Sequence, residues 1–67
     1  MFLVINGENY DDLPENLTVL GVVEHLKLPA KKVAVELNRE VVSKSAYADT
    51  ILQDNDQLEI IHFIGGG

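Results

Sequence analysis

The residues best suited to chemistry are the last three, Gly65-Gly66-Gly67, which follow the apolar run 58–64. That run is rich in β-branched residues and is typical of a strand. Glycine has no side chain to obstruct close approach by another protein, and three extended residues reach about 10 Å. We therefore expect the α-carboxylate of Gly67 to be the reactive group, with Gly65 and Gly66 recognised as a flexible tail.

A glycine carboxylate has an ordinary pKa of about 3.5, so at neutral pH it is an ionised and unreactive acyl group. It must be activated from outside, for example as an acyl-adenylate formed by a partner enzyme. The alternative is a frayed end or an engineered remnant with no function of its own.

The other polar residues do not form a catalytic or metal-binding pattern. His25 and His62 are too few for a metal site, which needs three or four ligands. Asp54 and Asp56 alternate as in a calcium loop, but the glycine and distal glutamate of that motif are missing. We expect no catalytic residue, no bound metal or cofactor, and a chain that is not itself an enzyme.

The composition narrows the class of protein. The chain has 67 residues, no cysteine and a formal net charge of −6. One small domain is expected, without disulfides or a cysteine nucleophile, and the cytoplasm is the expected location. An acidic chain is a poor ligand for nucleic acid, whereas a basic protein surface would suit it. The charge could also serve solubility alone. No stretch predicts a membrane span.

Patterns along the chain predict one helix and four to five strands. Thr18 is a plausible helix N-cap and Pro29 is expected to end that helix. Tyr47 is expected to anchor a single helical turn within 43–48. The predicted strands are 2–5, 8–10, 33–37, 41–42 and the last apolar run, with turns at 6–7, 38–40 and 54–56. The helix shows one apolar stripe formed by Val19, Val22, Val23 and Leu26.

One helix on one face of a mixed sheet is an α+β fold. The first and last strands are the most apolar, so we expect them to be parallel neighbours in the centre of the sheet. The predicted organisation is a single domain over 1–64 and a tail over 65–67.

The face of the sheet away from the helix retains apolar side chains, which often mark an interaction site. We expect a partner-binding face, with an alternative that some of these residues pack under the loop 49–54 or at a dimer contact. The residues expected there are Phe2, Val4, Ala34, Ile61 and Phe63.

Taken together, the chain resembles the ubiquitin-like β-grasp family, and within it the bacterial sulfur carrier proteins of thiamine biosynthesis. The resemblance covers the whole chain, and the terminal Gly66-Gly67 at this length is its most specific feature. Weaker matches are Asn6-Gly7, Thr18-Val19, the segment 33–38, Val41-Val42 and the turn 54–56. Asn55 departs from the family, which commonly has glycine there, but asparagine tolerates positive φ.

The resemblance implies a carrier mechanism. An E1-like adenylyltransferase would use ATP and magnesium to adenylate Gly67, and sulfur from a cysteine desulfurase would convert the adenylate to a thiocarboxylate. Thiazole synthase would then accept the sulfur for the thiazole ring of thiamine. Three alternatives stay open: the small subunit of molybdopterin synthase, a ubiquitin-like protein modifier, and a plain interaction module.

Overall fold

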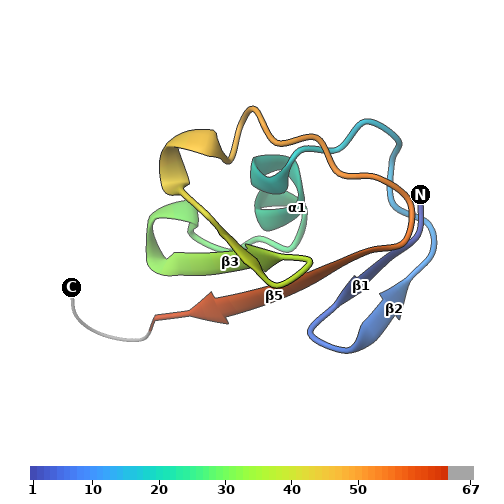
Figure 1. Ribbon diagram of the computed structural model, residues 1–67, viewed down its shortest axis with the longest axis horizontal. Coiled ribbons are helices and arrows are strands. Elements are labelled where there is room, and N and C mark those ends of the chain that lie inside the picture. Colours follow the sequence, from blue (N-terminus) through green and yellow to red (C-terminus); the bar gives the residue numbers. More distant parts are fainter. Residues whose placement is uncertain (64–67) are drawn as a thin grey trace.

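The computed structural model describes residues 1–63 as one mixed sheet with a helix packed on one of its faces (Figure 1). The predicted tail, Gly65–Gly67, lies outside the described residues, as does residue 64. The elements in chain order are β1 (Leu3–Ile5), β2 (Glu8–Tyr10), α1 (Val19–His25), the 3₁₀ turn η1 (Ala30–Lys32), β3 (Val33–Leu37), β4 (Glu40–Val42), the 3₁₀ turn η2 (Lys44–Ala46) and β5 (Asp56–His62).

The five strands lie in the order β2-β1-β5-β3-β4. The first and last strands are parallel neighbours, with Leu3 opposite Asp56 and Ile5 opposite Leu58. The other pairs are antiparallel, so β5 lies in the centre between β1 and β3. This confirms the predicted α+β class with a mixed sheet and one main helix.

Two tight turns join the outer strand pairs. Asn6 and Gly7 have φ of 52° and 80°, and Asn38 and Arg39 have φ of 50° and 71°. Positive φ at both central residues defines the turn that matches the twist of a two-residue hairpin. Asn-Gly is the sequence that favours it most, whereas Arg39 adopts a conformation that side chains with a Cβ disfavour.

Helix α1 begins as predicted, since the Gly21 amide donates to the Thr18 hydroxyl at 3.0 Å. Its end was predicted wrongly at Pro29: the helix stops at His25, with Lys27 at φ 60°. The Lys27 amide donates to Glu24 O and the Leu28 amide to Val23 O. These two bonds form a Schellman motif, with lysine at the position that glycine usually fills.

The core lies between α1 and the sheet. Tyr47 is buried there, as expected, and its hydroxyl donates to Val33 O at 3.2 Å. The buried residues that make up this core are Leu3, Ile5, Leu13, Val19, Val22, Val23, Val33, Val35, Tyr47, Leu52, Leu58 and Ile60.

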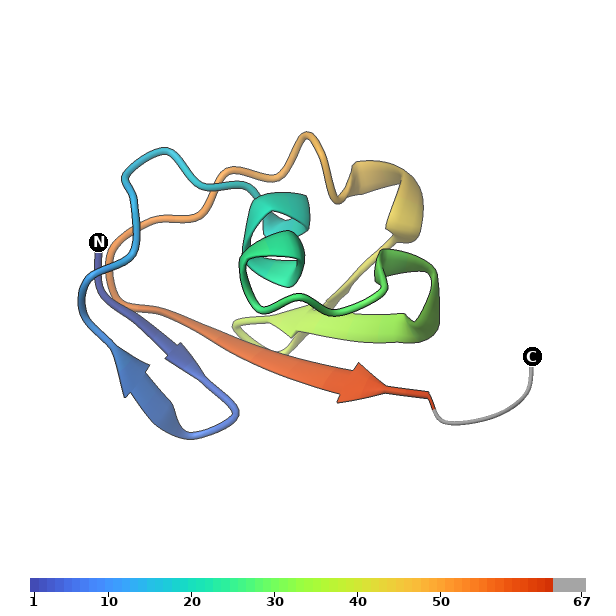
Figure 2. The same cartoon turned by 180° about the vertical axis from the view of Figure 1, so that it is seen from behind.

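The loop 49–54 lies on the helix side of the molecule, as Figures 1 and 2 both show. Its Leu52 is buried and the Leu52 amide donates to Leu17 O at 2.8 Å, just before α1. Most of the loop therefore lies on the helix side and not on the face predicted to bind a partner, while Asp54, at its end, accepts a hydrogen bond from the amide of Phe2, a residue predicted for that face. Within residues 1–63, no helix has the length and hydropathy needed to cross a membrane.

Candidate functional site

The strand that leads to the glycines is held from both sides by asparagine side chains. Asn6 Nδ2 donates to Ile60 O at 3.1 Å, and the Ile60 amide donates to Asn6 Oδ1 at 2.7 Å. The Asn6 side chain thus takes the place of a backbone peptide and extends the pairing of β1 with β5 beyond Ile5. Asn6 was predicted only as a turn residue, and its contact with Ile60, 54 positions away, was missed.

On the other side of β5, Asn38 plays the equivalent part. The Gln57 amide donates to Asn38 Oδ1 at 3.0 Å, and Asn38 Nδ2 donates to Asp56 Oδ1 at 3.0 Å. The two hairpin turns therefore each supply one side chain that fixes the central strand. The consequence is a firmly positioned β5, from which the predicted tail departs.

A further set of contacts holds the end of β5. The Phe63 amide donates to Lys32 O at 2.7 Å, one residue beyond the pairing of His62 with Val33. Lys44 Nζ donates to Lys31 O at 2.6 Å and lies 5.9 Å from the centre of the Phe63 ring. The last described residue is thus hydrogen-bonded to η1 and lies close to Lys44.

The predicted partner-binding residues divide into two groups along the open face. Ala34 and Ile61 are direct partners across β3 and β5, and Phe63 follows two residues later. Phe2 and Val4 lie near the start of β5 instead: the Phe2 amide donates to Asp54 Oδ1 and Val4 is opposite Gln57. Ile61 and Phe63 are 56% and 48% exposed, whereas the other three are partly buried.

Val41 was not predicted to belong to this face, yet it is 78% exposed and directly opposite Glu36 on β3. Its neighbour Val42 is opposite Val35, a core residue, so strand alternation turns Val41 to the open face. The alternation was visible in the sequence, but the pairing that sets it was not. Glu36 is also directly opposite Glu59 of β5, which places two carboxylates next to each other on this face.

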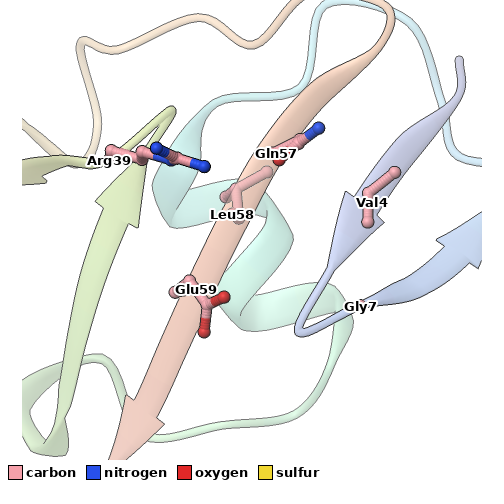
Figure 3. A pocket seen from close by; sticks show the side chains of 6 residues that line it. All are labelled: Val4, Gly7, Arg39, Gln57, Leu58 and Glu59. Carbon is pink, nitrogen blue, oxygen red and sulfur yellow. The ribbon is translucent and has the colours of Figure 1, made fainter.

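A shallow hollow of about 180 Å³ lies on the open face (Figure 3). Figure 3 shows Gln57 and Glu59 along β5, with Arg39 at the β3–β4 turn on one side and Val4 of β1 on the other. Leu58 and Gly7 complete its lining. Small-molecule sites usually measure roughly 300–1,000 Å³, so this hollow suits a single side chain better than a ligand.

His25 and His62 are both exposed, on α1 and at the end of β5. Over residues 1–63, no three side chains of the kinds that bind metals come together.

The sequence model of the ThiS family matches residues 3–67. The chain belongs to the ThiS family. The crystal structure of a thiamine biosynthesis protein, ThiS, from Geobacter metallireducens superposes with a TM-score of 0.84 at 39% identity, covering all of both chains. The sulfur carrier protein ThiS of Bacillus subtilis is 35% identical over 97% of this chain and 98% of its own length.

Two larger proteins also match. A thiazole synthase of Paramagnetospirillum magneticum is 48% identical to this chain, and one of Magnetococcus marinus is 42% identical, each over 67 residues. The chain spans only 20% of the length of each of these relatives. Sequences of the ThiS family thus occur as a small chain and as part of a thiazole synthase.

Proposed function

We propose that this chain is a sulfur carrier protein of thiamine biosynthesis whose cargo is held at the carboxyl group of Gly67. A partner enzyme adenylates that carboxylate with ATP and magnesium and releases pyrophosphate. A persulfide then displaces AMP to form an acyl disulfide, and a thiol of the partner cleaves its S–S bond, which leaves the thiocarboxylate on this chain and a disulfide on the partner. The sulfur then passes to thiazole synthase for the thiazole ring. In this scheme the chain is a carrier on which enzymes act, and ATP and magnesium belong to the adenylating partner.

The observation that carries the proposal is the alignment of the ThiS family through residue 67, glycines included. The B. subtilis relative, which matches over nearly its whole length, bears the name of a sulfur carrier protein. The absence of cysteine from the sequence adds a chemical argument, since no side chain here could carry sulfur as a persulfide. These names favour the thiamine pathway over the molybdopterin synthase subunit and over a protein modifier.

Thiazole synthase is the proposed acceptor because two proteins of that name contain a region similar to this chain. The open face of the sheet, with Ile61 and Phe63 close to the glycines in sequence, is the proposed docking surface. A cysteine desulfurase is the proposed origin of the sulfur, delivered through the adenylating enzyme.

Intact mass spectrometry tests the proposal. After incubation with the adenylating enzyme, ATP, magnesium and a sulfur source, the chain should gain about 16 Da, as oxygen is replaced by sulfur at the activated acyl group. A variant lacking Gly66 and Gly67 should keep the urea midpoint of the intact chain and gain no mass. Loading of that truncated variant, or a mass gain located elsewhere, would refute the proposal.

A further inference from the structure

We propose that the open face binds a protein surface on which an arginine is set among apolar side chains, and that Glu36 and Glu59 receive this arginine. The inference rests on the proposed function, because it takes thiazole synthase as the partner. It adds to that proposal the chemistry by which the partner is recognised.

The apolar part of the surface comes from three exposed side chains, one on β4 and two on β5 or directly after it. Ile61 of β5 is the direct partner of Ala34 of β3, and Val41 of β4 lies diagonally from Ala34, at the end of the adjacent row that holds Glu36. Phe63 follows two residues after Ile61, just past the end of β5. Exposed residues of this size gathered on one face indicate an interaction surface.

The charged part lies in the next row of the same face. Val41, Glu36 and Glu59 are successive neighbours across β4, β3 and β5. Like charges directly opposite each other destabilise a sheet. The one ion pair that residues 1–63 form joins the Met1 amino group to Glu15, so neither carboxylate of this row is neutralised by an ion pair there.

The chain's own arginine does not resolve this repulsion. Arg39 lines the hollow beside Glu59, yet it forms no ion pair among the described residues. A guanidinium from outside suits the site for two reasons. Its planar group can hydrogen-bond to carboxylates on both strands, and it stacks favourably on apolar surface.

A second copy of the chain is a poor occupant of the same face. It would bring another Glu36–Glu59 pair and a second net charge of −6 against the first. Like-charge contacts of this kind disfavour association. A cationic partner surface, in contrast, would be attracted by the same carboxylates. The charge pattern therefore selects a basic partner.

The test compares two double variants that remove the same charge. Glu36→Gln with Glu59→Gln alters the open face, and Glu8→Gln with Glu24→Gln alters exposed positions on β2 and α1. Binding of each full-length chain to thiazole synthase of the same organism is measured by calorimetry at low and moderate salt. We expect the face variant to weaken binding by about tenfold or more and to reduce its salt dependence, while the control changes Kd by less than about threefold.

Stability separates recognition from folding. Because the like-charge pair is removed, the face variant should have an unchanged or higher urea midpoint. A lower midpoint would mean that Arg39 or another group of this chain stabilises the pair, and would overturn the inference. Equal affinities for the two variants, no binding of the unmodified chain, or a dimer that dissociates on changing the face would also overturn it.

The mass measurement at Gly67 is independent of this comparison. If the chain never gains sulfur but the face variant alone loses binding, the carrier proposal fails and the recognition site stands. If loading proceeds and the face variant binds like the control, only the recognition site fails.

Discussion

Replacing Asn6 by alanine should loosen the central strand, because it removes both side-chain hydrogen bonds to the backbone of Ile60. Each such bond contributes about 0.5–1.5 kcal/mol, so their loss costs about 1–3 kcal/mol. Asn6 also has φ of 52°, and alanine in that region costs a further 1 kcal/mol or so. The expected loss is about 2–4 kcal/mol.

That loss is large for a domain of this size. At roughly 0.05–0.15 kcal/mol per residue, 67 residues give a free energy of unfolding of about 3–10 kcal/mol. Urea unfolding of Asn6→Ala, followed by circular dichroism, should therefore show a much lower midpoint with a similar slope. Asn6→Gly relieves the backbone strain and still removes both bonds, so it should be destabilised less than the alanine variant.

Asn9→Ala is the matched control. Asn9 is exposed on β2, and its side chain makes no hydrogen bond among residues 1–63, so its loss should change stability by less than about 0.5 kcal/mol. Hydrogen exchange provides the local readout, since the Ile60 amide loses its acceptor only in the Asn6 variants. An Asn6→Ala protein as stable as the control, with the Ile60 amide exchanging at the original rate, would refute the conclusion that the Asn6 side chain holds β5 through Ile60.

Three further predictions concern the helix end, the core and the end of β5. Lys27→Gly should raise the free energy of unfolding by about 1 kcal/mol in urea unfolding, because glycine accepts the positive φ at this helix end without strain. Burial raises the pKa of Tyr47 above its ordinary value of 10.0, so the unfolded chain ionises first and stability should fall as pH rises through 10. Tyr47→Phe should flatten that fall, measured by urea midpoints from pH 8 to 11, and should cost about 1 kcal/mol at neutral pH through the lost hydrogen bond to Val33 O. Lys44→Gln should speed hydrogen exchange of the Phe63 amide while changing global stability by less than about 1 kcal/mol.

Local sequence signals predicted the elements of this fold well. Asn6-Gly7 gave the first hairpin, Thr18 gave the start of the helix, and the alternation in 33–37 gave β3 with the bounds that the structure has. The parallel pairing of β1 with β5 followed from their apolar character alone. The turn and the helix cap depend on interactions within a few residues. The positions of the strands follow from which side chains of each strand are buried.

The failures have a different origin. The end of α1 was missed because its Schellman motif has Lys27 at the position of positive φ, where a glycine would have marked the end of the helix in the sequence. Val41 was missed because the predicted strand, 41–42, is too short to show which of its side chains faces the core. The hydrogen bonds of Asn6 to Ile60 and the Glu36–Glu59 pair join segments that are far apart in the sequence. The periodicity of a single segment does not predict such contacts.

In the proposed function, the position of β5 links docking on the open face to delivery of the Gly67 carboxyl group through covalent geometry. Ile61 and Phe63 lie on or just past the strand that is held by Asn6, Asn38 and Lys32. Gly67 is four residues beyond Phe63, so its Cα can lie at most about 14 Å from the Cα of Phe63, and its carboxyl carbon about 1.5 Å further. A partner that binds the open face must therefore place its reactive centre within this reach. A rigid strand is useful here because, if the root of the tail moved, contact with the face would no longer determine where the carboxyl group arrives.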